Sequence, residues 1–209
     1  MIKAVVFDMD GVLIDAREWH YEALNRALAI VGFEISRADH LTTFDGLSTR
    51  QKLEILSTTD NLPRELHSFI NKLKQSYTME IVSTRCKPTF SHQYALSSLK
   101  ARGLKLAVAS NSIRNTVEMM MQRAQLDKYL DLQLSNEDVE SPKPAPDIYL
   151  KAMRMLGVSP SQTLVVEDNE HGRQSARAAG AHVLPVRNPN DVTLTNIEIY
   201  LSRLLEVST

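Results

Sequence analysis

Short apolar runs rich in β-branched residues recur along this 209-residue chain, and segments with helical periodicity separate them. Such runs are typical of buried strands, and they span residues 2–7, 104–109, 163–166 and 181–186. The helical segments between them cover residues 94–102, 115–126, 147–156 and 171–179. Strands that alternate with helices predict right-handed parallel crossovers. The sequence therefore predicts an α/β fold, a Rossmann-like doubly wound parallel sheet with helices on both faces.

Residues from about 15 to 87 break this alternation. They read as helices over residues 18–31, 49–56 and 63–77, with no convincing strand between them. A helical block between the first and second strands predicts an inserted helical cap domain. We therefore expect a core domain of residues 1–14 and 88–209 and a cap domain of residues 15–87, joined by crossings near residues 14–16 and 83–88.

Composition and charge narrow the class of protein. The chain has 24 Lys and Arg against 25 Asp and Glu, a net charge of -1, so it lacks the positive field that holds a nucleic-acid backbone. No apolar run approaches the roughly 18 residues that span a bilayer. The single cysteine, Cys86, excludes an internal disulfide and is expected to pack rather than react. We expect a cytoplasmic protein without nucleic-acid or membrane partners, as a monomer or a weak homo-oligomer.

Polar residues follow three of the predicted strands where each strand ends. They are Asp8, Asp10 and Gly11 after the first, Ser110, Asn111 and Ser112 after the second, and Glu167, Asp168 and Asn169 after the third. The carboxyl ends of parallel strands share one edge of a sheet, where ligands gather. We therefore expect these residues to line one crevice, with Lys143 contributed by a loop that contains three prolines.

The four carboxylates of this crevice predict a bound cation. Like charges a few ångströms apart raise one another's pKa or recruit a counter-ion. Ligands that are all oxygen, with positions left for water and phosphate, favour Mg²⁺. An EF-hand calcium loop is excluded, because Gly11 comes too early for that motif and a strand rather than a helix precedes it.

The residues after the second predicted strand favour an anion as the ligand. They precede a helix, so their hydroxyls and backbone N–H groups can bind an anion with help from the helix dipole. A metal, a helix N-terminus and Lys143 around a carboxylate nucleophile form a constellation for phosphoryl transfer. The glycine-rich motifs of nucleotide-binding folds are missing from the chain.

Four motifs of the chain resemble, in order and spacing, those of the haloacid dehalogenase-like phosphohydrolase superfamily, and the resemblance covers nearly the whole chain. They are Asp8–Val12, Ser110–Asn111, Ser141–Pro144 and Glu167–Asn169. Asp15, His20 and the stretch Gly46–Ser48 resemble the helical cap of one subgroup. That subgroup holds β-phosphoglucomutase, phosphoglycolate phosphatase and sugar-phosphate phosphatases.

The resemblance implies a chemical role for the carboxylates. Asp8 would attack phosphorus and form an aspartyl-phosphate, and Asp10 would protonate the leaving oxygen and then activate water. Mg²⁺ would be bound by Asp8, the backbone carbonyl of Asp10 and Asp168, with Glu167 as a direct or an indirect partner. Dehalogenase chemistry is not expected, because enzymes of that kind lack an acidic residue at the position of Asp10.

The resemblance also implies which groups bind the phosphoryl oxygens. Ser110 and the Asn111 amide would hold them, and Lys143 would offset the charge of the nucleophile and the phosphate. His171 is expected to lie on a helix face rather than to act.

Substrate choice is expected to depend on the cap, because closure of a cap presents its side chains to the leaving group. The candidate residues are Arg17, Trp19, His20, Thr49, Arg50 and Lys74. The chain departs from the β-phosphoglucomutases at Ala16, where they have a hydroxyl residue, and at Thr49, where they have an arginine. Residues 87–92 also lack their Pro-Gly.

We therefore expect a Mg²⁺-dependent phosphomonoester hydrolase that acts on a small phosphorylated metabolite, a sugar or polyol phosphate, through an aspartyl-phosphate. Two alternatives stay open: a β-phosphoglucomutase-like mutase, and a binding module that has kept the fold without turnover. A mutase needs to bind a second phosphate, and the departures in the cap remove part of the site that would bind it. The sequence does not identify the substrate.

Overall fold

A computed structural model describes residues 1–44 and 47–206 of the chain. The structure divides into two compact units. One unit is formed by Met1–Asp15 together with Cys86–Thr209, and the other is the intervening segment Ala16–Arg85.

The first unit contains a five-stranded parallel sheet with the strand order β3-β2-β1-β4-β5. The strands are β1 (Ala4–Phe7), β2 (Lys105–Ala109), β3 (Leu132–Leu134), β4 (Thr163–Glu167) and β5 (His182–Pro185). The parallel, doubly wound sheet predicted from the sequence is confirmed.

The register of β1 with its two neighbours decides where the site forms. Phe7 is paired with Val108 of β2 on one side and with Val166 of β4 on the other. The backbone N–H of Asp8 donates to the carbonyl of Val166 at 3.0 Å, so the pairing with β4 continues past the end of the strand. Asp8 therefore stands at the centre of the carboxyl edge of the sheet, beside Glu167.

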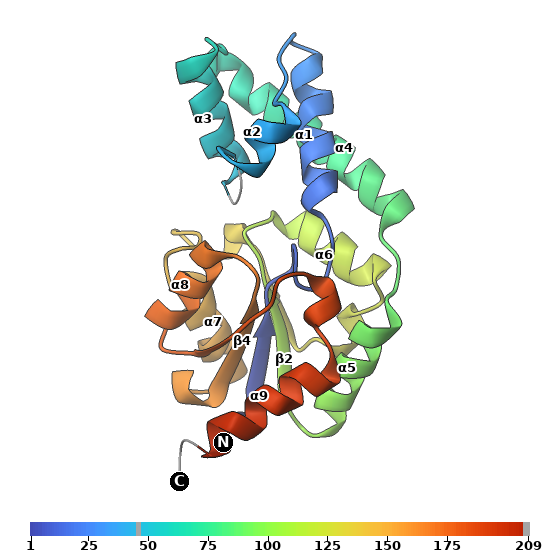
Figure 1. Ribbon diagram of the computed structural model, residues 1–209, viewed down its shortest axis with the longest axis vertical. Helices are drawn as coiled ribbons and strands as arrows, with labels where there is room; N and C mark the ends of the chain where they lie inside the picture. The colour runs from blue at the N-terminus through green and yellow to red at the C-terminus, as the bar shows by residue number, and fades with distance from the viewer. Residues whose placement is uncertain (45–46, 207–209) are drawn as a thin grey trace. The chain divides into compact units, whose positions relative to one another are not determined.

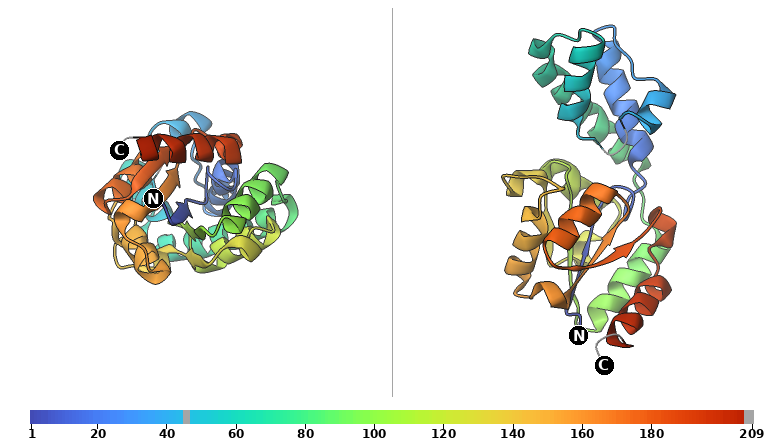
Figure 2. Two further views of the ribbon diagram at one scale, coloured as in Figure 1. Left: turned by 90° about the horizontal axis from the view of Figure 1, so that it is seen from below. Right: turned by 60° about the vertical axis from the view of Figure 1, so that its left-hand side comes forward.

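Helices cover both faces of this sheet. Helices α7 and α8 pack on one face, and α5, α6 and α9 lie on the other (Figure 1, Figure 2). Their bounds are α5 (Phe90–Ala101), α6 (Arg114–Arg123), α7 (Asp147–Leu156), α8 (Glu170–Ala178) and α9 (Leu194–Glu206). All four residues of β1 are fully buried, because side chains alternate between two covered faces. Ala4 and Val6 pack with Ile148 and Ala152 of α7.

The second unit contains helices and no strand among its described residues. Its helices are α1 (Arg17–Ala29), α2 (Arg37–Leu41), α3 (Thr49–Thr59) and α4 (His67–Arg85). Leu24, Leu28, Leu53 and Ile70 belong to its buried core. Ser48 begins α3 with a reciprocal capping box to Gln51, which satisfies backbone donors at the start of the helix. In the described part of the chain, no helix is long and apolar enough to cross a membrane.

Several elements differ from the prediction. The sequence did not predict β3, which has three residues with the polar Gln133 at its centre, nor α2 and α9. The predicted helix over residues 63–77 instead begins as a 3₁₀ turn at Arg64 and continues as α4 to Arg85. Residues 83–85, predicted to lie in a crossing between domains, are therefore helical.

Candidate active site

The loop after β1 carries two of the predicted site residues, Asp8 and Asp10. Gly11 turns this loop with a φ of +84°, a conformation that glycine adopts at no steric cost. A Cβ atom at Gly11 would lie 2.1 Å from Oδ2 of Asp168, so only glycine lets that carboxylate approach the loop. Gly11 thus allows the turn of the loop and also leaves space for Asp168, which follows β4.

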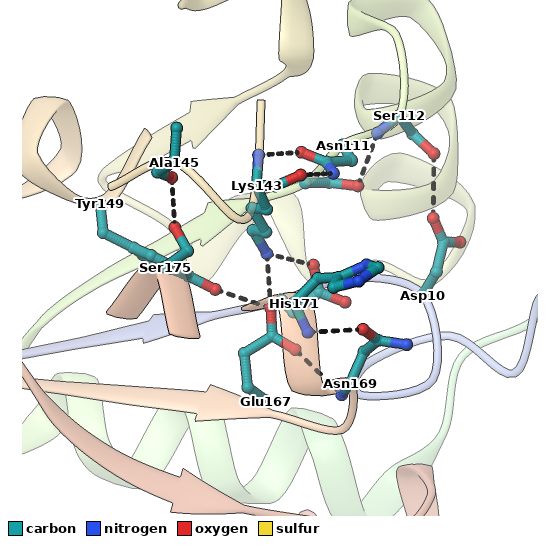
Figure 3. A network of polar contacts seen from close by, with 12 residues as sticks. Asp10, Asn111, Ser112, Lys143, Ala145, Tyr149, Glu167, Asn169, His171 and Ser175 are labelled. Atoms are coloured by element: carbon teal, nitrogen blue, oxygen red, sulfur yellow. Dashed lines mark hydrogen bonds and ion pairs between the residues drawn. The ribbon is translucent and has the colours of Figure 1, made fainter. Parts of the chain in front are cut away.

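The loop that carries Lys143 is fixed at two places. The side-chain amide of Asn111 accepts the Lys143 backbone N–H at 3.0 Å and donates to the Lys143 carbonyl at 3.2 Å (Figure 3). The hydroxyl of Ser175 on α8 donates to the carbonyl of Ala145 at 2.6 Å. These bonds hold the backbone on both sides of the lysine, so its side chain is directed to one place.

The side chain of Lys143 ends between Asp8 and Glu167. The ammonium Nζ of Lys143 donates to Oδ1 of Asp8 at 2.6 Å and to Oε1 of Glu167 at 2.7 Å. The side chains of Lys143 and Glu167 are 4% and 1% exposed, so this is a buried ion-pair cluster and solvent screens it little. Residues that lie 135 positions apart in the sequence thus meet at the edge of the sheet, as predicted.

Three carboxylates of the site fit a divalent cation. Asp8, Glu167 and Asp168 each offer an oxygen, and these oxygens lie within 4.8 Å of one another. A donor set made only of oxygens suits Mg²⁺, which is bound by few carboxylates and keeps other positions for water and substrate oxygens.

Burial and charge decide the protonation of this cluster. Burial raises the pKa of Asp8 well above its usual value, Lys143 opposes the shift, and the three neighbouring carboxylates add to it. Burial acts to lower the pKa of Lys143, but Asp8 and Glu167 outweigh it and hold that pKa well above its usual value. Lys143 is therefore a permanent cation. Burial also raises the pKa of Tyr149 well above its usual value, so its hydroxyl keeps its proton.

Asp10 lies beside the end of β2. The hydroxyl of Ser112 donates to Oδ2 of Asp10 at 2.9 Å, and the hydroxyl of Ser110 accepts the Ser112 backbone N–H at 3.0 Å (Figure 3). These contacts join the ends of β1 and β2 and hold the carboxylate that is predicted to move protons.

The first N–H group of α6 lies beyond the residues that are predicted to bind an anion, and it already has a partner. The helix begins at Arg114, and its backbone N–H donates to Oε2 of Glu137 at 2.7 Å. A carboxylate of the chain therefore already occupies this N–H group. The turn before the helix, with Ser110 and Asn111, is the part that remains as a candidate to bind phosphate.

The sequence analysis missed two residues that shape the site. Tyr149, on the first turn of α7, donates from its hydroxyl to Oε1 of Glu167 at 2.8 Å. Gly172, on α8, lies against the same carboxylate, and a Cβ atom there would stand 1.7 Å from Oε1 of Glu167. A buried tyrosine needs a partner for its hydroxyl, but the apolar spacing of α7 gave no sign of which partner it would be.

Replacing Gly172 by alanine is expected to lower activity about 10- to 100-fold, as the loss of a group that orients a metal site does. Alanine favours a helix by about 1 kcal/mol over glycine, but forcing a methyl group into a filled space costs about 1–3 kcal/mol. The clash with Glu167 therefore outweighs the gain. Activity and urea unfolding should be compared with Gln174→Ala, a change at an exposed position of the same helix. Equal activity in the two variants would contradict this account.

The candidate specificity residues all lie in the second unit. Arg17, Trp19 and His20 lie on α1, Thr49 and Arg50 begin α3, and Lys74 lies on α4. The structure brings two of them together, since Nζ of Lys74 lies 3.1 Å from Nδ1 of His20. Gly46 lies outside the described residues.

Cys86 and His171 are placed as the sequence analysis expected. Cys86 is 2% exposed, and burial raises the pKa of its thiol to about 11, so it is a packing residue. His171 lies on the first turn of α8, where its backbone N–H donates to Oδ1 of Asn169 at 2.9 Å.

Comparison with known proteins places this geometry in a family. The sequence model of the haloacid dehalogenase-like hydrolases matches residues 5–186. The chain belongs to this family. Its relatives include a phosphorylated carbohydrates phosphatase of Thermotoga maritima, 30% identical over 179 residues, which make up 86% of this chain and 82% of the relative. A phosphoglycolate phosphatase of Aquifex aeolicus is 29% identical over the same shares.

The fold of this haloacid dehalogenase-like hydrolase is also found in solved structures. A β-phosphoglucomutase from Clostridium difficile matches with a TM-score of 0.82 at 20% identity, over 98% of this chain and 99% of that one. This likeness concerns the fold alone. The family and its relatives confirm the predicted class of enzyme, a phosphatase.

Proposed function

We propose that this hydrolase is a Mg²⁺-dependent phosphomonoesterase that cleaves a small sugar or polyol phosphate through an aspartyl-phosphate. The observation that supports this most is the buried contact of Lys143 with Asp8 and Glu167 at the edge of the sheet. A relative that is named for its action on phosphorylated carbohydrates supports the substrate class.

In the first step, a carboxylate oxygen of Asp8 attacks the phosphorus atom of the substrate. The new bond joins Asp8 to phosphorus, and the bond from phosphorus to the ester oxygen breaks. Asp10 gives its proton to that oxygen, so the product leaves as a neutral alcohol. Lys143 offsets the negative charge beside the nucleophile throughout the step.

In the second step, Asp10 takes a proton from a water molecule that attacks the same phosphorus atom. The bond to Asp8 then breaks, and inorganic phosphate leaves. Ser112 holds the carboxylate of Asp10 in reach of both steps. The Ser110 hydroxyl and the Asn111 backbone N–H are assigned to the phosphoryl oxygens, because the Asn111 side chain is engaged by Lys143.

Asp8 and Asp168, with Glu167 beside them, would hold Mg²⁺, and we assign the backbone carbonyl of Asp10 as a further ligand. At these residues a bound Mg²⁺ would neutralise negative charge and polarise the phosphoryl group. The acidic residues that would otherwise repel a phosphate then become part of its binding site.

We assign the choice of leaving group to the inserted helical unit. His20 and Lys74 form one polar pair there, and the remaining candidates are Arg17, Trp19, Thr49 and Arg50. All six belong to α1, α3 and α4, whereas the chemical groups belong to the other unit.

Phosphate release from a panel of sugar and polyol phosphates, with Mg²⁺ and with EDTA, tests the proposal. Release is expected only with Mg²⁺, concentrated on few members of the panel, and restored when Mg²⁺ is added back. Folded protein that binds Mg²⁺ but releases no phosphate from any member would contradict it. Conversion of glucose 1-phosphate to glucose 6-phosphate without release, when primed by a bisphosphate, would show a mutase instead.

A further inference from the structure

Tyr149 reaches the buried ion-pair cluster from α7. Its side chain is fully buried. The Nζ atom of Lys143 lies 4.8 Å from the centre of its ring, and its hydroxyl lies 2.8 Å from Oε1 of Glu167 (Figure 3). One side chain thus touches both members of the Lys143–Glu167 pair, by its ring face and by its hydroxyl.

Two donors meet on the same oxygen of Glu167. Oε1 accepts from Lys143 at 2.7 Å and from Tyr149 at 2.8 Å. The other oxygen, Oε2, accepts the backbone N–H of Asn169 at 3.2 Å. The carboxylate is therefore held at both oxygens, and the plane in which it lies is set by a neutral donor, a cationic donor and a backbone donor together.

The hydroxyl of Tyr149 does what Lys143 cannot do alone. An ammonium group is a compact charge that accepts many orientations of its partner, so a bond from Lys143 leaves Glu167 free to turn about it. The hydroxyl of Tyr149, on α7, limits that freedom together with the backbone N–H of Asn169. The ring meanwhile faces the ammonium group, an attraction that is strong where water is excluded. Lys143 is then kept at 2.6 Å from Asp8.

We propose that Tyr149 is a positioning residue of this enzyme, which orients Glu167 through its hydroxyl and Lys143 through its ring so that the cluster is ordered before Mg²⁺ and substrate bind. The inference rests on the proposed phosphatase function. Tyr149 lies on α7 but would then support the chemistry at the carboxyl ends of the strands.

Tyr149→Phe tests the hydroxyl, and Tyr200→Phe is its matched control. Tyr200 donates its hydroxyl to the carbonyl of Val183 at 2.7 Å, a part-buried bond to a backbone acceptor that involves no site residue. For Tyr149→Phe we expect kcat to fall about 10-fold at an unchanged KM, and Mg²⁺ binding measured by calorimetry to weaken about 10-fold. Tyr200→Phe should leave both values as in the wild type, and its urea midpoint should shift less than that of Tyr149→Phe, which loses a buried bond to a carboxylate.

A second variant separates the ring from the hydroxyl. Tyr149→Leu removes both, and it is expected to lower kcat further than Tyr149→Phe, which keeps the ring face toward Lys143. Wild-type values of kcat and of Mg²⁺ binding in folded Tyr149→Phe protein would overturn the inference and leave the phosphatase function intact. If the wild type binds Mg²⁺ but is inactive on every substrate, the proposed function fails. The Mg²⁺ affinities of Tyr149→Phe and of its control Tyr200→Phe still decide the role of Tyr149.

Discussion

Asp8→Asn is expected to lower phosphate release by a factor of about 10³ or more, because the amide oxygen is too weak a nucleophile to form the covalent intermediate. The change is nearly isosteric. The amide oxygen can still accept the hydrogen bond that Lys143 donates to Asp8, so the variant is expected to fold and to keep the cluster in place. The loss then reports chemistry rather than structure.

Steady-state release and trapping of the covalent intermediate measure this effect. Wild-type protein mixed with labelled substrate should yield an acid-stable, hydroxylamine-sensitive phosphoprotein, and Asp8→Asn should yield none. Asp127→Asn, at an exposed position of the same unit, is the control and should behave as the wild type. Turnover of Asp8→Asn at more than about a tenth of the wild-type rate would refute the covalent mechanism.

Lys143→Met is expected to cost both activity and stability. Methionine has a similar length but no charge, so Asp8 and Glu167 lose the cation that lies between them. Removal of one partner from a buried ion pair destabilises a protein by about 3–5 kcal/mol. Loss of a group that stabilises charge in the transition state lowers the rate by at least about 10²-fold.

Unfolding in urea, with EDTA present, measures the stability loss. Lys143 lowers the pKa of the buried Asp8, so its removal raises that pKa further above the unfolded value. When the pKa of a group is higher in the folded than in the unfolded protein, the free energy of unfolding falls as pH rises. The difference in free energy of unfolding between the wild type and Lys143→Met should therefore be larger near about pH 8 than near about pH 5.

Lys151→Met is the matched control for this change. Lys151 also lies beside an aspartate, Asp138, at 3.6 Å, but its side chain is 35% exposed, and such pairs contribute about 1 kcal/mol or less. If the free energy of unfolding falls no more in Lys143→Met than in Lys151→Met, the stability of the cluster does not depend on its lysine.

The sequence allowed two features to be predicted: the strands are parallel, and polar residues gather at their carboxyl ends. Both depend on patterns that a sequence displays. The runs over residues 4–7 and 163–166 are buried, and their sequences read as short, mainly hydrophobic strands. The edge strand Leu132–Leu134 was missed, since three residues with a central glutamine give no periodicity to detect.

The polar residues of the site could be predicted by type, but the contacts between them could not. Asn111 was expected to bind phosphate, yet its side chain holds the backbone of Lys143. Tyr149 looks like any buried residue of an amphipathic helix, because a hydroxyl partner that lies 18 positions away leaves no local pattern. Gly172 likewise matters through the space it leaves for Glu167, which only the folded chain defines.

The strand order also bears on how the enzyme comes into being. Asp8 directly follows the central strand β1, but its partner Lys143 comes 135 positions later, and β4, which pairs with β1 and ends at Glu167, follows later still. A ribosome that has made Asp8 has yet to make Lys143, Glu167 and Asp168. The proposed site is therefore incomplete in the nascent chain until β4 has been synthesised and has paired with β1.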